Sequence, residues 1–330
     1  MTRKHKQIDP NDVRFFSGRS NPILARKIAD YLELPLETTH FSKFSNDNLF
    51  VQLGSSVRGR RVYIVQSLVT PVSDHLLELL MMLDIAKSAA AHDIHAIIPY
   101  YSYARSDKKD APRISITARL VADLLQTAGA TRIMTMTLHS PQVHGFFSVP
   151  TDPLTARGLF ADYMLENGKD LANAVVVAPD VGSAKSASRF AELLDLPTAA
   201  AQKTRISDHQ VKIGSLFQRQ VAGFHHAIIY DDEIATGGTV IELSRLLVES
   251  GINKITLICT HGLFLGKAFA RLNAIPQIQE IITTDTVPRT PETQPSNMTI
   301  LSTAPIFGQA IRQNYLHRSI GELFDFGADK

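Results

Sequence analysis

Apolar runs and amphipathic stretches alternate along almost the whole chain, and this alternation is the feature that most limits the fold. Short apolar runs predict buried strands, and stretches with helical periodicity predict helices. Strands that alternate with helices of this length are typical of βαβ units with parallel sheets. The predicted strands are Val62–Gln66, Ala96–Pro99, Arg132–Leu138, Ala174–Ala178, His226–Tyr230 and Ile255–Thr260, and the predicted helices are His75–Ala91, Ile116–Thr127, Leu154–Glu166, Ser183–Leu194 and Val240–Ser250.

Three segments break this rhythm. Two prolines lie in Val149–Pro153, where we place a boundary between two α/β halves. The segment Gln202–Gln210 is polar, and Thr286–Asn297 contains three prolines and is predicted to be an exposed loop. In parallel sheets, ligands bind at the carboxyl ends of strands, so side chains that follow the predicted strands are the candidates for chemistry.

The composition is that of an ordinary soluble globular chain. Its 330 residues carry a formal net charge of +2, which gives no electrostatic argument for nucleic-acid binding. The single cysteine, Cys259, fits a reducing, cytoplasmic setting. No stretch reaches the ~20 apolar residues of a membrane span, and the basic start Met1–Gln7 is not followed by an apolar stretch, so we expect neither a membrane anchor nor a signal peptide.

The segment Ile228–Thr239 joins an apolar run, two carboxylates and a turn of glycine and threonine. Asp231 and Asp232 follow the run, and a helical pattern follows Thr236–Thr239. Glycines let backbone N–H groups approach a phosphate closely, and a helix N-terminus attracts anions. The carboxylates can accept hydrogen bonds from ribose hydroxyls or bind Mg²⁺. This order favours a ribose 5-phosphate site, and the alternative is an ordinary turn between strand and helix.

Two strand ends in the first half carry basic side chains. Arg105 can bind a phosphate through two parallel hydrogen bonds, with Lys108 as a further charge. The alternative is a solvated charge cluster on a loop. His139 is a candidate Mg²⁺ ligand or phosphate contact, although a lone histidine is more often structural.

Two segments in the second half suit phosphate chemistry. Asp180 begins a Gly/Ser turn between a strand and a helix, which is the arrangement of an anion site. Lys203 and Arg205 lie between this turn and Thr236–Thr239. Phosphoryl-type transfer depends mostly on positioning and charge stabilisation, so two cations there suit it. No stretch matches G-x-x-x-x-G-K-[ST], which excludes a Walker A loop.

These segments, in this order, resemble the ribose-phosphate pyrophosphokinases, and the resemblance runs from about Arg14 to Phe324. It implies two similar domains of the phosphoribosyltransferase type I fold, each a mainly parallel sheet flanked by helices. The expected domains are an ATP-side domain over residues 1–152 and a ribose 5-phosphate domain over residues 153–304. Residues 305–330 are expected to pack back on the first domain.

The resemblance also implies roles for single residues. Lys203 and Arg205 are the expected catalytic pair, on a flexible loop. The expected ATP-binding residues are Phe44, Asn46, Arg105, Asp107 and His139. The expected ribose 5-phosphate residues are Asp180, Asp231, Asp232, Ala235, Thr236, Gly237, Gly238 and Thr239. The expected metal ligands are His139 and Asp180, and the expected allosteric residues are Ser56, Arg58 and Ser319.

The reaction implied by the resemblance is ATP + ribose 5-phosphate → AMP + 5-phosphoribosyl 1-diphosphate, with Mg²⁺ as the cofactor. The family forms rings of six built from dimers, so a homo-oligomer based on dimers, of hexamer size, is expected. In such a ring the hairpin that carries Phe44 reaches the ATP site of a neighbouring subunit. The alternative for Phe44 is simple core packing.

The sequence departs from the family pattern at Asn48, Ser106, Thr137 and Ser183. These departures motivate a second hypothesis, a catalytically weak regulatory paralogue that assembles with an active synthetase. A third hypothesis, a phosphoribosyltransferase, ranks low because such chains lack the half that contains Arg105.

Two further departures concern regulation. Gly321 and Glu322 stand where the family often has Ser and Tyr, next to Ser319. A carboxylate beside an anion pocket repels phosphate. We therefore expect weak or absent activation by inorganic phosphate.

Overall fold

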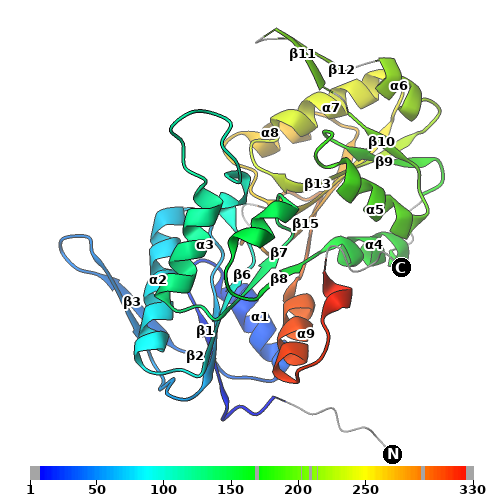
Figure 1. Ribbon diagram of the computed structural model, residues 1–330. Helices are drawn as coiled ribbons and strands as arrows, with labels where there is room; N and C mark the ends of the chain where they lie inside the picture. Colours follow the sequence, from blue (N-terminus) through cyan, green and yellow to red (C-terminus); the bar gives the residue numbers. More distant parts are fainter. Residues whose placement is uncertain are drawn as a thin grey trace, which may run out of the picture. The chain divides into compact units, whose positions relative to one another are not determined.

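The computed structural model describes residues 8–167, 171–201, 203–207, 210–213, 215–290 and 294–324, with only the backbone of 203–207, 210–213 and 215. The chain divides into two compact units (Figure 1). Unit 1 contains the described residues up to Thr155, residues 286–288 and those from Ser302 onward, and unit 2 contains those of Ala156–Asp285 and Arg289–Leu301. The predicted fold class, two α/β units each with a parallel sheet flanked by helices, is confirmed.

Unit 1 is built on a six-stranded sheet with the order β2-β1-β5-β6-β7-β8, in which neighbouring strands are parallel. Both faces are covered, so the central strands are almost wholly apolar and buried. Its strands are β1 (Val13–Ser17), β2 (Leu36–Glu37), β5 (Arg61–Val65), β6 (Asp93–Ile98), β7 (Arg132–Met136) and β8 (Thr151–Leu154).

Two pairs of helices pack together in unit 1, α1 (Pro22–Leu32) beside α9 (Ala304–Tyr315) and α2 (Val72–Ser88) beside α3 (Thr117–Ala128). Pro22 suits the first position of α1, and the side chain of the preceding Asn21 accepts a hydrogen bond from the Leu24 N–H at 3.3 Å. Gly308 of α9 faces the Tyr31 ring so closely that a side chain there would collide with it. The shorter elements are the antiparallel hairpin of β3 (Thr39–Lys43) and β4 (Leu49–Leu53) and the 3₁₀ turns η1 (Ser102–Arg105), η2 (Pro141–Phe146) and η4 (Gly321–Leu323).

Unit 2 is also built on a six-stranded parallel sheet, with the order β10-β9-β13-β14-β15-β16. Helices α4 and α5 pack together, as do α7 and α8. The strands are β9 (Ala174–Ala178), β10 (Thr198–Ala200), β13 (His226–Ile234), β14 (Lys254–Gly262), β15 (Ile278–Thr284) and β16 (Met298–Leu301), with a hairpin of β11 (Lys203–Ser207) and β12 (Gln210–Ile213). The helices are α4 (Arg157–Glu166), α5 (Ala184–Leu194), α6 (Ser215–Val221), α7 (Gly238–Glu249) and α8 (Ala268–Asn273).

All the predicted strands and helices form; Ala174–Ala178 has the predicted ends, and the others differ at one end or both. The strand predicted to end at Tyr230 continues to Ile234, because its backbone keeps pairing with β14. The segment Val149–Pro153, expected as a break, contributes to β8, an edge strand that tolerates Pro153. The segment Thr286–Asn297 was wrongly predicted to be exposed at its start: Thr286 and Val287 are buried, and the Thr286 carbonyl accepts a hydrogen bond from Ser67 Oγ at 2.8 Å.

The single cysteine lies within the core of unit 2. Cys259 is buried in β14, and burial raises the pKa of its thiol to about 12. Its Sγ donates a weak hydrogen bond to Thr283 Oγ1 at 3.6 Å. None of the helices in the described part of the chain combines the length and the apolar character that crossing a membrane requires.

Candidate active site

The loop between β13 and α7 has the backbone geometry of an anion site. Gly237 adopts a left-handed conformation with φ of +71°, which glycine adopts without steric cost. Its carbonyl accepts the first hydrogen bond of α7, from the Ile241 N–H at 2.9 Å. The N–H groups of the first helical turn have no carbonyl partner within a helix, and they lie at the positive end of the helix dipole. Ala235–Thr239 therefore presents the donors that a phosphate needs.

The acidic pair lies inside strand β13, not beyond its end as the sequence predicted. Asp231 pairs with Cys259 of β14, and the ladder continues to Ile234. Asp231 Oδ1 accepts a hydrogen bond from the Asp232 N–H at 3.0 Å. Burial, followed by the negative charge of Asp232, raises the pKa of Asp231 well above its usual range. A ligand with hydroxyl donors or a positive charge would stabilise the ionised pair.

The loop after β9 is closed by hydrogen bonds between Asp180 and Ser183. Asp180 Oδ1 accepts from the Ser183 N–H at 2.9 Å and from the Ser183 hydroxyl at 3.2 Å. The Asp180 side chain is exposed, and its negative charge also contributes to the raised pKa of Asp231. The two loops predicted to bind ribose 5-phosphate are thus electrostatically linked within unit 2.

The predicted metal ligands belong to different units, His139 to unit 1 and Asp180 to unit 2. Within the residues that the structure describes, no group of three His, Cys, Asp or Glu side chains could hold a metal ion by itself. The carboxylates of Asp180, Asp231 and Asp232 nevertheless fit Mg²⁺, which proteins usually bind through one or two carboxylates together with substrate phosphates. Burial first, and then the negative charges of Asp232 and Asp180, raise the pKa of Asp231, and a divalent cation would offset both effects.

The predicted catalytic pair is described only through its backbone. Lys203 and Arg205 lie in β11, where they pair with Ile213 and Val211 of β12. Their side chains lie outside the described part of the chain, so their role stays a prediction.

The hairpin of β3 and β4 carries Phe44 at its tip. The Phe44 side chain is 58% exposed, which argues against core packing. Its ring meets the Phe50 ring edge to face, with centroids 5.8 Å apart. Asn46 Oδ1 accepts a hydrogen bond from the Asn48 backbone N–H at 3.2 Å, so the Asn46 side chain helps to close the turn.

The loop after β6 places Arg105 on the surface at the end of η1 and leaves Asp107 partly buried. Ser106 between them has a structural role: its hydroxyl accepts a hydrogen bond from the Thr117 N–H at 3.3 Å, at the start of α3. This bond satisfies one of the unpaired donors of that helix end.

The loop after β7 carries His139 exposed to solvent. Thr137, two residues earlier, has φ of +39°, which is unfavourable for a β-branched residue. Its N–H donates to the Leu154 carbonyl at 2.8 Å, which holds the turn against β8.

The predicted allosteric residues are all exposed in unit 1. Ser56 and Arg58 lie between β4 and β5, and Ser319 lies between α9 and η4. The Ser319 hydroxyl accepts a hydrogen bond from the Gly321 N–H at 3.3 Å, and Glu322 is exposed beside it.

Sequence reasoning missed the turn after β14 that holds the start of the Ala235–Thr239 loop. The N–H of Leu263 donates to the Ile234 carbonyl at 3.0 Å, and the N–H of Leu265 donates to the Ala235 carbonyl at 2.8 Å. The sequence signal was present, since Gly262 and Gly266 bracket an apolar triplet directly after a predicted strand.

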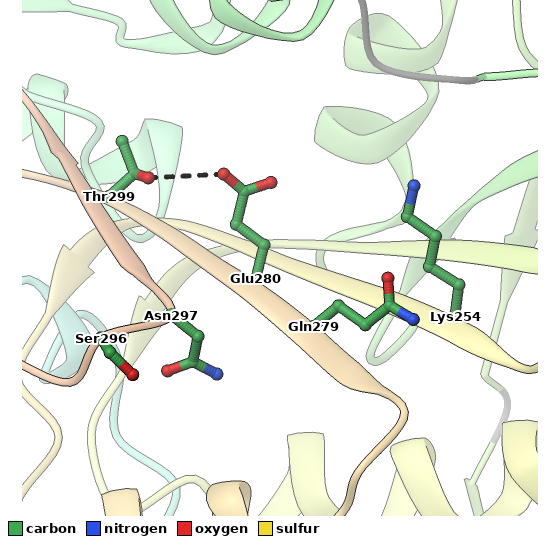
Figure 2. A pocket seen from close by; sticks show the side chains of 6 residues that line it. All are labelled: Lys254, Gln279, Glu280, Ser296, Asn297 and Thr299. Atoms are coloured by element: carbon green, nitrogen blue, oxygen red, sulfur yellow. Dashed lines mark hydrogen bonds between the residues drawn. The ribbon is translucent and has the colours of Figure 1, made fainter.

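A separate polar pocket lies at the opposite edge of the unit 2 sheet. Figure 2 shows Glu280 directed towards Thr299, whose Oγ1 donates to Glu280 Oε1 at 3.3 Å. The Tyr163 hydroxyl donates to the same oxygen at 2.7 Å. Because the pocket lies at the amino ends of β14, β15 and β16, it is not part of the candidate active site. Its lining residues are Lys254, Gln279, Glu280, Ser296, Asn297 and Thr299.

Family models match both ends of the chain. A model described as the N-terminal domain of ribose phosphate pyrophosphokinase matches residues 13–129. A model described as the phosphoribosyl synthetase-associated domain matches residues 217–325. The second match contains Asp231, Asp232 and the Ala235–Thr239 loop.

Full-length relatives agree with these models. The putative ribose-phosphate pyrophosphokinase of Streptomyces coelicolor is 50% identical over 314 residues, which is 95% of this chain and 98% of that protein. The ribose-phosphate pyrophosphokinase of Deinococcus radiodurans is 44% identical over 317 residues, or 94% and 97% of the two chains. The crystal structure of phosphoribosylpyrophosphate synthetase from Mycobacterium smegmatis matches with a TM-score of 0.85 and 36% identity, over 93% of this chain and 99% of that one.

Proposed function

The chain belongs to the ribose-phosphate pyrophosphokinase family, and we propose that it transfers the β,γ-diphosphoryl group of ATP to the 1-hydroxyl of ribose 5-phosphate. The products are 5-phosphoribosyl 1-diphosphate and AMP. Unit 1 binds ATP in this proposal, and unit 2 binds ribose 5-phosphate.

The observation that carries the proposal is the junction of β13 and α7. Asp231 and Asp232 lie four to eight residues before Thr236–Thr239, so hydroxyl acceptors and phosphate donors come from one strand and the turn that follows it. Asp231 and Asp232 accept hydrogen bonds from the ribose hydroxyls, and the backbone N–H groups of Ala235–Thr239 bind the 5-phosphate.

The reaction makes one bond and breaks one. The 1-hydroxyl oxygen of the ribose attacks the β-phosphorus of ATP in line, and the bridge oxygen between the α- and β-phosphorus leaves with AMP. The hydroxyl proton is lost to solvent or a neighbouring base. Lys203 and Arg205 are proposed to stabilise the negative charge that develops on the transferred group.

Mg²⁺ is the proposed cofactor. When bound, it neutralises charge on the phosphate oxygens and makes the β-phosphorus a better electrophile. Asp180 and His139 are its proposed protein ligands. Asp231 and Asp232 are carboxylates near this site that could contact the cation together with substrate phosphates.

ATP is proposed to bind through Phe44, Asn46, Arg105, Asp107 and His139. The exposure of Phe44 supports a ring that stacks on a purine. We propose that the enzyme assembles from dimers into a hexamer, in which the β3–β4 hairpin completes the ATP site of a neighbour. Its proposed setting is the cytoplasm.

The test is an assay of AMP formation from ATP in the presence of Mg²⁺, with and without ribose 5-phosphate. We expect AMP formation that depends strictly on ribose 5-phosphate. The double variant Lys203→Ala/Arg205→Ala should lower turnover by ~10³-fold or more. The matched control is Glu249→Gln, an exposed carboxylate at the far end of α7, which should leave turnover unchanged.

Two results would contradict the proposal. Folded protein that binds ATP but forms no AMP would favour the regulatory paralogue instead. Near-normal turnover in the double variant would remove Lys203 and Arg205 from the mechanism while leaving the reaction in place.

A further inference from the structure

The segment between β15 and β16 carries an arginine that lies against two stacked aromatic rings of unit 2. The guanidinium carbon of Arg289 lies 4.9 Å from the centroid of the Phe264 ring and 4.9 Å from that of the Phe269 ring. The two rings stack on each other with centroids 4.5 Å apart and an interplanar angle of 23°. Such contacts attract a cation, which offsets the burial that lowers the pKa of Arg289.

The same guanidinium binds the backbone at the end of β14. Arg289 Nη2 donates hydrogen bonds to the Gly262 carbonyl at 2.6 Å and to the Leu263 carbonyl at 2.8 Å. Hydrogen bonds from a charged donor are shorter and stronger than neutral ones. Arg289 therefore fixes two consecutive carbonyl groups of the turn that follows the strand.

This turn has an unfavourable backbone that needs such support. Phe264 adopts φ of +46°, a left-handed conformation that is disfavoured for a bulky residue. At Gly262, an added Cβ would collide with the Phe264 ring and the Thr283 hydroxyl. Unfavourable conformations persist only where their surroundings hold them. Arg289 contacts both the backbone carbonyls of this turn and the ring of Phe264.

The 262–265 turn in turn fixes the backbone at the start of the Ala235–Thr239 loop. The N–H groups of Leu263 and Phe264 both donate to the Ile234 carbonyl at 3.0 Å, and the Leu265 N–H donates to the Ala235 carbonyl at 2.8 Å. These carbonyls directly precede Thr236–Thr239. Ala268 also lies close to Gly237, whose added Cβ would come within 3.9 Å of the Ala268 Cβ.

We propose that Arg289 is a positioning residue for ribose 5-phosphate: it holds the 262–265 turn, which holds the Ile234 and Ala235 carbonyls and so orients the N–H groups of Thr236–Thr239. The inference rests on the proposed function, in which these N–H groups bind the 5-phosphate. A loop that is already ordered loses less entropy when its ligand binds. Arg289 thus acts on affinity for one of the two substrates and touches neither.

Kinetics with three variants test this role. Arg289→Leu is expected to raise the KM for ribose 5-phosphate about tenfold, with the KM for ATP changed less than about twofold. Arg289→Lys keeps a charged donor but loses the planar contact with the rings, so it should fall between the parent and Arg289→Leu. The control Arg271→Gln removes an exposed arginine from α8 and should leave both constants unchanged. Equal changes in the two KM values, or none in Arg289→Leu, would overturn the proposal.

Hydrogen exchange of the unliganded protein tests the structural step without relying on activity. In Arg289→Leu we expect faster exchange at 262–265 and at 235–239, with no change around Asp180. If this pattern appears in a protein that makes no AMP, Arg289 still orders the loop and the proposed reaction alone is wrong. If Arg289→Leu does not fold, Arg289→Lys decides: parental exchange in both segments together with a parental KM for ribose 5-phosphate would overturn the inference.

Discussion

Ser183 hydrogen-bonds to Asp180 through both its N–H and its hydroxyl, at 2.9 and 3.2 Å from the same carboxylate oxygen. The hydroxyl also donates to the Asp180 carbonyl at 3.1 Å. A glycine at this position could supply only the N–H. The departure at Ser183 therefore tightens the loop without removing the Asp180 carboxylate from it.

Ser183→Ala is expected to lower the free energy of unfolding by about 1 kcal/mol, because the hydroxyl bonds are lost while the N–H bond remains. Turnover should stay within about threefold of the parent, since the backbone donor that orients Asp180 is kept. Urea unfolding and the AMP assay measure the two quantities. The half-buried Ser188 of α5, whose hydroxyl lies 3.5 Å from Glu192 Oε1, gives the matched control Ser188→Ala, and equal destabilisation by both changes would contradict the role of the Ser183 hydroxyl.

Asp231→Asn should stabilise the unliganded protein and weaken its binding of ribose 5-phosphate. Because the folded-state pKa of Asp231 is raised, its ionised form is disfavoured in the fold, and stability decreases as pH rises from the pKa of an unfolded aspartate through the folded value. Asparagine removes that charge, so the thermal midpoint at pH 7 should rise by a few degrees. We expect kcat/KM for ribose 5-phosphate to fall about tenfold or more, because a charged acceptor is lost.

The control for Asp231→Asn is Glu249→Gln, at the C-terminal end of α7. It should change neither the thermal midpoint nor the affinity. A lower thermal midpoint for Asp231→Asn would show that its charge is compensated in the folded protein.

His95 should make the protein less stable in mild acid. Burial lowers the pKa of His95 to about 3, and its ring packs 4.5 Å from that of Tyr63. The unfolded chain binds a proton near pH 6.5 that the folded chain does not, so stability falls as pH drops from 6.5 towards 3, by up to about 1.4 kcal/mol per pH unit. His95→Leu should reduce this slope, measured by urea unfolding between pH 7.5 and 5. The exposed His40 provides the control His40→Gln, whose slope should equal that of the parent.

Thr137→Asn and Thr137→Asp should both stabilise the protein by about 1 kcal/mol, because these residues tolerate a left-handed backbone better than threonine does. Only aspartate adds a carboxylate beside His139. Thr137→Asp should therefore also lower the Mg²⁺ concentration needed for half-maximal activity, whereas Thr137→Asn should not. Identical Mg²⁺ dependence in the two variants would exclude a contribution of this carboxylate to the metal site.

Inorganic phosphate should raise the activity less than about twofold, because the exposed Glu322 beside Ser319 repels an anion. Glu322→Gln should increase the response. The measurement is the AMP assay over a phosphate series at constant ionic strength. A steep, sigmoidal rise in the parent protein would contradict the prediction.

The local sequence pattern predicted most of the fold. A buried parallel strand is an apolar run, and it can be recognised without knowing which strands it pairs with. The end of β13 could not be predicted in this way. Asp231, Asp232 and Glu233 are polar, and what keeps them in a strand is pairing with β14, a contact that only the folded chain makes. Thr286 was missed for the same reason, since its partner is Ser67.

The candidate site also has features that the local sequence predicts and one that it does not. The Ala235–Thr239 loop and the Asp180 turn depend on glycine, on helix ends and on residues within one short segment, so their sequence signals were strong. Arg289 had no such signal, because it acts on Gly262 and Leu263, far from it in sequence. Its neighbouring prolines favoured an exposed loop instead.

Within the described residues, unit 1 contains the first strand, β1, and the last α-helix, α9, and unit 2 lies between them in the sequence. A ribosome makes the chain from its N-terminus, so every residue of unit 2 has been synthesised before α9 emerges. Until then Tyr31 of α1 has no Gly308 to pack against, and Leu154 of β8 has no bridge to Phe324. The unit that is begun first during translation is therefore the one that is completed last.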